Sequence, residues 1–211
     1  MGSLQLARAS LPYLGALLTA SLLAYLVWNR TGHPAAGVVF WVLLCLTGSI
    51  VWFFRDPERD VRRDDRIVLS PCDGTMRKLH RQGRTQTIEV FLAVWNVHVQ
   101  RAPSDGKVVS RKFTKGEYRM AFDDMAGERN TRCATEFRTK HGSVGLVQIA
   151  GAVARRVECW VKPGDLVRQG ERIGIIHFGS QCRITLPASA KVLIRPGDTV
   201  AGGLTPIARW R

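Results

Sequence analysis

Apolar residues are concentrated in two long runs near the start of the chain. The first covers residues 11–28 and the second covers residues 35–54, and neither contains a charged residue. At 1.5 Å per residue, each run is long enough to cross a hydrocarbon core of roughly 30 Å. We therefore predict that residues 1–54 form a membrane hairpin with two helical spans.

The segment between the runs, residues 29–34, is short and polar, and it predicts a tight turn with both ends of the hairpin on one side. Arg30 lies in this turn, whereas the exit of the second run is crowded by Arg55, Arg59, Arg62, Arg63 and Arg66. The positive-inside rule then places the remainder of the chain on the cytoplasmic side of the cell membrane. A signal peptide or a pair of buried core helices is the alternative for the whole region, and an interfacial helix is the alternative for the first span.

Residues 55–211 show a different pattern, in which apolar and polar residues alternate with a period of two. This alternation predicts short strands, which we place at residues 88–92, 97–99, 144–149, 156–161, 172–176 and 191–194. The tripeptide Pro-Gly-Asp recurs at residues 163–165 and 196–198, where Pro presets φ and Gly admits a positive φ, as tight turns require. A short helix fits between Glu117 and Glu128. Short strands joined by such turns resemble the barrel-sandwich hybrid, so we expect a mainly β soluble domain of that kind.

Composition narrows the partners of this domain. The 211 residues include 31 Lys and Arg against 17 Asp and Glu, which gives a net charge of +14 and favours an anionic partner. Aromatic residues are only sparsely interleaved with basic ones, and this argues against nucleic acid. The five cysteines are widely spaced and form no CxxC pair, so we expect neither a disulfide framework nor a structural metal, and a reducing compartment.

Three local features carry candidate chemistry. Gly179-Ser180 interrupts an apolar strand pattern, and a strained peptide bond before a hydroxyl can undergo an N-to-O acyl shift. His98 is flanked by valines, which turns its side chain to the opposite face of a strand from both. Asp73 follows Ser-Pro-Cys and either caps its turn or serves a polar site. Taken alone, each of these features is more often structural than catalytic.

The features gain meaning from the motifs around them and from their order along the chain. After the apolar hairpin, the chain carries FFRDPERD at 53–60, SPCDG at 70–74, VWNVHVQRAPSDGKV at 94–108, GEYRMAF at 116–122, LVQIAGAVARR at 146–156 and GIIHFGS at 174–180. Together they resemble the short form of the phosphatidylserine decarboxylase family across essentially the whole chain. An archaetidylserine-type relative is a close alternative.

The resemblance implies a proenzyme that cuts itself between Gly179 and Ser180 into a large chain, 1–179, and a small chain, 180–211. Ser180 becomes a pyruvoyl group, a covalent cofactor that forms a Schiff base with the serine headgroup and draws electrons during the loss of CO₂. Phosphatidylserine is thereby converted to phosphatidylethanolamine. The implied partners are anionic phospholipid and the membrane, with the two chains held as a heterodimer. No nucleic acid is expected, and a higher oligomer is left open.

Residue roles follow from the same resemblance. The family's Asp-His-Ser arrangement corresponds to Asp73, His98 and Ser180, with a base oriented by a carboxylate. Longer members carry a second histidine where this chain has Arg101, so we expect His98 to serve both maturation and decarboxylation. The alternative is that Arg101, a candidate for contact with substrate or membrane, takes part of that role by electrostatic stabilisation. His177 lies three residues before Ser180, and a solvent-facing strand position is preferred there over a contact with lipid phosphate.

Arg59, Arg62 and Arg63 are candidates for holding the domain against anionic headgroups, and orientation of the hairpin is the alternative role. Residues 181–183 differ from the sequence typical of short forms, which affects the surroundings of the cut. A noncatalytic, membrane-anchored adaptor of barrel-sandwich type is the rival function. That reading requires long α-hairpin arms, which the body lacks, and an extracytoplasmic location, which the arginine asymmetry opposes.

Overall fold

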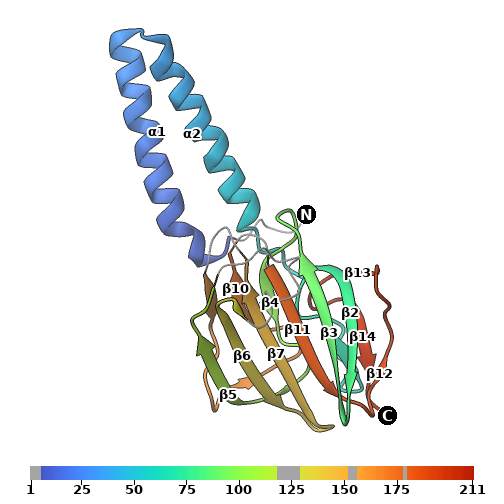
Figure 1. Ribbon diagram of the computed structural model, residues 1–211. Coiled ribbons are helices and arrows are strands. Elements are labelled where there is room, and N and C mark those ends of the chain that lie inside the picture. The colour runs from blue at the N-terminus through green and yellow to red at the C-terminus, as the bar shows by residue number, and fades with distance from the viewer. Residues whose placement is uncertain (1–5, 118–128, 152–155, 178–179) are drawn as a thin grey trace. The chain divides into compact units, whose positions relative to one another are not determined.

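The computed structural model describes residues 6–117, 129–151, 156–177 and 180–211 (Figure 1), with only the backbone described at Ser180. The short helix expected between Glu117 and Glu128 and the expected cleavage residue Gly179 lie outside the described residues. The chain divides into two compact units, Met1–Glu58 and Arg59–Arg211. Each unit has its own internal structure.

The first unit is a helical hairpin. Its elements are η1 (Arg8–Ser10), α1 (Leu11–Thr31) and α2 (Pro34–Phe53). Gly32 ends α1 with a left-handed φ of 64°, and Pro34 opens α2, where its missing N–H costs no helical hydrogen bond. Phe40 of α2 lies against Tyr25 and Trp28 of α1, with ring centroids 5.6 and 6.0 Å apart. Both helices are long and apolar enough to cross a membrane, as the sequence pattern predicts.

The second unit is built of antiparallel strands. In chain order these are β1 (Ile67–Leu69), β2 (Gly74–Gln82), β3 (Thr85–Leu92), β4 (Val99–Arg101), β5 (Gly106–Thr114), β6 (Arg132–Arg138), β7 (Ser143–Ala150), β8 (Val157–Cys159), β9 (Leu166–Val167), β10 (Arg172–Ile176), β11 (Ser180–Pro187), β12 (Lys191–Val192), β13 (Thr199–Val200) and β14 (Pro206–Arg209). In the described residues they form a large sheet in the order β13-β2-β3-β11-β7-β6-β5-β9 and two small sheets, β4-β10-β8 and β1-β14-β12.

The large sheet is strongly curved (Figure 1), and its inner face supplies much of the apolar core of the unit. Strand β11 illustrates the pattern, because Cys182, Ile184 and Leu186 alternate with more polar residues and are each at most 1% exposed. These side chains pack in the same core cluster as Ile88 and Val90 of β3. The prediction of a mainly β domain preceded by two apolar helices is therefore confirmed.

The two Pro-Gly-Asp turns have the same local structure. Gly164 and Gly197 adopt φ values of 100° and 97°, which L side chains rarely reach. In each turn the aspartate, Asp165 or Asp198, accepts a hydrogen bond from the backbone N–H three residues earlier, at 2.9 and 2.8 Å. The predicted tight turns are confirmed.

Some predicted strands differ in their limits. The strand expected at residues 97–99 is displaced, since β4 begins only at Val99. The reason is a tight turn at residues 93–96, in which the Asn96 N–H donates to the Ala93 carbonyl oxygen at 2.9 Å. The strands expected at 156–161 and 191–194 shorten to three and two residues, respectively.

Candidate active site

One end of the large sheet gathers the segments that carry the candidate residues. Thr75 of β2, Phe91 of β3 and Gln181 of β11 lie in one row across three neighbouring strands. In the next row, Ser180 pairs with Leu92 of β3 on one side and with β7 on the other. Asp73 stands two residues before Thr75 at the same end of the sheet. Adjacent strands are about 4.8 Å apart, so the register brings Asp73 and Ser180 to within a few strand spacings.

His98 reaches the same end by a second route. β3 pairs with β11 in the large sheet, and β4 pairs with β10 in a small sheet. The chain therefore passes between the same two sheets twice, from β3 to β4 and from β10 to β11. The Ile176 N–H donates to the His98 carbonyl oxygen at 3.2 Å. His98 therefore lies beside the end of β10.

The His98 ring is fully buried and oriented by backbone. Its Nδ1 lies 2.9 Å from the carbonyl oxygen of Asn96. A carbonyl oxygen only accepts, so Nδ1 carries the proton, and in the neutral ring Nε2 is the basic nitrogen. This backbone contact orients the ring at Nδ1, and the orientation of the base by a carboxylate stays a prediction.

Asp73 is held by an arginine. The Arg59 guanidinium contacts both carboxylate oxygens of Asp73, at 2.6 and 2.9 Å, and the Gly202 N–H donates to one of them at 2.7 Å. The Arg59 and Asp73 side chains are only 7% and 17% exposed. Gly74 fixes the backbone here, since an added Cβ would lie 2.1 Å from the Phe91 carbonyl oxygen. Arg59, expected at the membrane surface, thus has a partner inside the domain.

Two thiols lie beside the candidate residues. Cys72 precedes Asp73 and Cys182 follows Ser180 by two residues, and both side chains are buried. Burial raises the pKa of the Cys72 thiol well above its usual range, and the neighbouring Cys182 raises it further. A buried thiol without its thiolate form is a poor nucleophile, so we assign Cys72 no chemical role.

His177 is buried, so the expectation of a solvent-facing position is wrong. Its backbone N–H donates to the Arg156 carbonyl oxygen at 3.0 Å, and its Nε2 lies 3.3 Å from a carboxylate oxygen of Glu158. The sequence pattern indicated the end of a strand there. It could not show that β8 lies alongside β10 and brings Glu158 to this side chain.

The environment of His177 predicts a pH-dependent stability. Burial lowers the pKa of His177, and the nearby Glu158 carboxylate opposes that shift only in part. The unfolded chain then binds a proton at this histidine more readily than the folded chain does. The stability that depends on a neutral His177 is therefore complete above about pH 6.5 and is lost as the pH falls toward the folded-state pKa. The melting temperature of the wild type should therefore fall more steeply between pH 7 and 5 than that of His177→Gln, and equal slopes would contradict this reading.

Several arginines meet at a cleft beside the Arg59 and Asp73 pair. The cleft has a volume of about 730 Å³, and it is lined in part by Arg59, Arg63, Arg101 and Arg168, with Asp60 and Glu171. Arg101 is only 5% exposed, and its guanidinium donates to the Gly170 carbonyl oxygen at 3.1 Å. The structure thus brings together three arginines that the sequence nominated. It adds Arg168, which lies far from them in sequence and gave no local signal.

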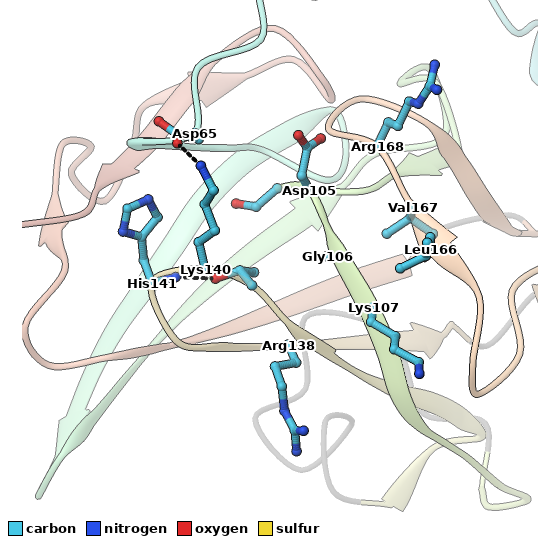
Figure 2. A pocket seen from close by; sticks show the side chains of 12 residues that line it. Asp65, Asp105, Gly106, Lys107, Arg138, Lys140, His141, Leu166, Val167 and Arg168 are labelled. Carbon is cyan, nitrogen blue, oxygen red and sulfur yellow. Dashed lines mark hydrogen bonds and ion pairs between the residues drawn. The ribbon is translucent and has the colours of Figure 1, made fainter.

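A second cleft, of about 440 Å³, lies at the other end of the strands, where β5 begins and β6 ends. Figure 2 shows Lys140 directed at Asp65, with the two charged atoms 2.9 Å apart. Arg138 and Arg168 extend in opposite directions. Its charges do not converge on a common point, and we assign this cleft no role.

Metal ligation gives no further candidate. Within the described parts of the chain, no three His, Cys, Asp or Glu side chains are grouped so that they could hold a metal ion. The end of the sheet that holds Asp73, His98 and Ser180, the reaction end, instead offers a carboxylate, a buried imidazole and the backbone at the start of β11. Such a set suits proton transfer beside a self-modified peptide bond.

Comparisons with known proteins point to one family. The family model described as phosphatidylserine decarboxylase matches residues 46–208. The chain is 39% identical over 212 residues to a phosphatidylserine decarboxylase proenzyme of Symbiobacterium thermophilum, covering 97% of this chain and 95% of that protein. It is 34% identical over 216 residues to the proenzyme of Syntrophus aciditrophicus, covering 97% of each chain. It is 38% identical over 210 residues to the proenzyme of Streptomyces griseus, covering 99% of this chain and 95% of that one.

These matches extend over nearly the full length of the proteins compared and include the whole sheet end described above. Their identities lie well above the level at which only the fold is shared. On this evidence the chain belongs to the phosphatidylserine decarboxylase family.

Proposed function

We propose that this protein decarboxylates phosphatidylserine to phosphatidylethanolamine after cleaving itself between Gly179 and Ser180. The relatives named above are proenzymes of that activity and are similar over nearly their whole length. The observation that carries the proposal is the register of the sheet. It puts Ser180 at the start of β11, in the row beside Leu92, with Asp73 and His98 at the same end.

In the proposed maturation, the Ser180 oxygen attacks the Gly179 carbonyl carbon and the peptide C–N bond breaks, which leaves an ester. In the elimination, a base removes the Ser180 Cα proton and the bond between Cβ and the ester oxygen breaks, which frees the Gly179 carboxylate and leaves dehydroalanine. Hydrolysis releases ammonia and leaves a pyruvoyl group at the new terminus. The residues present fit this group, because its position opens a strand beside a buried imidazole. When formed, the pyruvoyl group supplies an electron sink for the loss of CO₂.

His98 is the proposed base and acid. Its Nδ1 proton is directed to the Asn96 carbonyl oxygen, so Nε2 can accept the Ser180 hydroxyl proton during maturation and deliver a proton after CO₂ has left. Asp73 adds the negative charge of the proposed site, balanced by Arg59 and fixed by the Gly202 N–H. Arg101 is permanently charged, so it acts by electrostatics alone.

The arginine cleft is the proposed site for the anionic headgroup. Arg63 and Arg168 are exposed and have guanidinium groups suited to bidentate contact with phosphate or carboxylate, whereas Arg101 lies deeper. We expect Arg63→Gln with Arg168→Gln to raise KM for phosphatidylserine about tenfold while kcat changes little. The two clefts share Arg168, so the matched control, Lys107→Gln with Arg138→Gln, neutralises two charges that line only the other cleft. A similar rise of KM in both double variants would contradict the assignment.

We further propose that the two apolar helices anchor the protein in the cell membrane and that the β unit lies on the cytoplasmic side. The arginines after α2, including Arg62 and Arg63, support this orientation by the positive-inside rule. After cleavage, the two chains are proposed to stay together as a heterodimer, because β11 of the small chain is the central partner of β3 and β7 of the large chain.

The function is tested by following CO₂ release and phosphatidylethanolamine formation from carboxyl-labelled phosphatidylserine with the purified full chain. Release that is blocked by a hydrazine is the expected result, because hydrazines trap an essential ketone. An ether-linked archaeal analogue, assayed in parallel, distinguishes the archaetidylserine alternative. Absence of CO₂ release from both lipids would refute the proposal and leave the adaptor function.

A further inference from the structure

The turn that leads from β3 toward β4 has an unusual composition. It is closed by two hydrogen bonds, from the Asn96 N–H to the Ala93 carbonyl oxygen at 2.9 Å and from the Ala93 N–H to the Asn96 side-chain oxygen at 2.8 Å. Val94 and Trp95 occupy its two corner positions. Tight turns normally carry Gly, Pro, Asn, Asp or Ser at these positions. This turn instead presents two apolar side chains.

Both side chains are exposed in a domain that buries its neighbouring apolar residues. Val94 is 52% exposed and Trp95 is 71% exposed, whereas Val97, two residues after Trp95, is 5% exposed. The turn closes without them, and the core cluster does not include them. Tryptophan favours the interface between water and hydrocarbon, since its ring is apolar and its N–H is polar.

The position of the turn links it to the reaction end. It follows Leu92, which pairs with Ser180, and Asn96 in the same turn orients the His98 ring through its carbonyl oxygen at 2.9 Å. The turn is thus fixed relative to both candidate residues. A surface that binds Trp95 would therefore lie at a defined distance from Ser180 and His98.

The charge on other segments at the reaction end favours an anionic surface. Arg132 opens β6 in the row of Ile149, next to the Ala150 that pairs with Ser180, and Arg156 lies beside His177 through a backbone hydrogen bond. The Arg156 side chain is 58% exposed, although Glu158 offsets part of its charge at 3.0 Å. Exposed apolar corners close to basic side chains are typical of segments that bind the interface of anionic bilayers.

We propose that the turn formed by Val94 and Trp95 inserts into the interfacial layer of an anionic phospholipid bilayer and holds the reaction end of the domain against the lipid headgroups. The inference rests on the proposed function, because it supposes that the substrate is a membrane lipid. Trp95 is in this view a positioning residue, and it takes no part in bond making or breaking.

The first test compares two forms of substrate with the full chain. Activity of Trp95→Ala and Trp95→Ser toward long-chain phosphatidylserine in vesicles should fall about tenfold in kcat/KM, whereas activity toward a short-chain, monomeric phosphatidylserine should stay within about twofold of the wild type. Trp160→Ala is the matched control, since Trp160 is also exposed, at 42%, and follows β8. Equal losses on both substrates would indicate a structural role and overturn the proposal, as would unchanged activity on vesicles.

The second test does not depend on catalysis. Tryptophan emission of the wild type minus that of Trp95→Phe isolates the signal of Trp95, and brominated phosphatidylserine in the vesicles should quench it. A difference signal that is not quenched refutes the insertion. Should the wild type release no CO₂ while the signal is quenched, the proposed function fails and the insertion stands.

Discussion

Ser180→Ala should leave the protein as a single chain of 23.5 kDa without decarboxylase activity. The substitution removes the Ser180 side-chain oxygen, which is the proposed nucleophile at the Gly179 carbonyl carbon. The backbone of β11 can pair as before. Both the cut and the ketone depend on that oxygen, so the two losses should occur together. Denaturing electrophoresis and the CO₂ assay provide the measurements.

The matched control for this variant is Ser189→Ala. Ser189 lies in the same proposed small chain but in an exposed position after β11, so cleavage and activity should be those of the wild type. A Ser180→Ala protein that is still cut after residue 179, or that still releases CO₂, would remove Ser180 from the account.

His98→Ala should slow self-cleavage by about 10²–10⁴-fold, the usual contribution of a positioned acid or base. The account assigns both proton transfers to Nε2 of this ring, so any protein that does mature should also show a reduced kcat. A time course of cleavage measures the first effect. The kcat of the separated mature fraction measures the second.

His141→Ala is the control for this prediction. His141 is exposed and lies between β6 and β7, at the other end of the strands from Ser180, so its loss should leave both rates unchanged. Normal cleavage with a reduced kcat in His98→Ala would restrict His98 to decarboxylation. Normal values of both would show that another group carries the protons.

Much of the fold could be predicted because local patterns determine it. The two charge-free runs became α1 and α2, and the alternation of period two over residues 172–176 gave the limits of β10. The Pro-Gly-Asp turns were equally local, since the Pro, the positive φ of Gly and the Asp acceptor all act within four residues. Such features depend on neighbours in sequence and need no knowledge of distant strands.

The site was harder to predict, because its contacts join distant segments. His177 is buried and contacts Glu158 of β8. Asp73 is paired with Arg59 and held by Gly202, and no periodicity of the sequence indicates these partners. The contact between Asn96 and the His98 ring is local, but it depends on the turn that displaced the start of β4. Motif order thus identified the candidate residues, and only the structure showed which atoms they face.

The identity of the terminal group at residue 180 tests the central claim most directly. Intact-mass analysis of the freshly purified protein should give a large chain, 1–179, and a small chain of 32 residues, 180–211, that is lighter by one ammonia than the same peptide beginning with serine. Treatment with phenylhydrazine should add one hydrazone to the small chain alone. A single uncut species, or a small chain that begins with unmodified serine, would contradict the account.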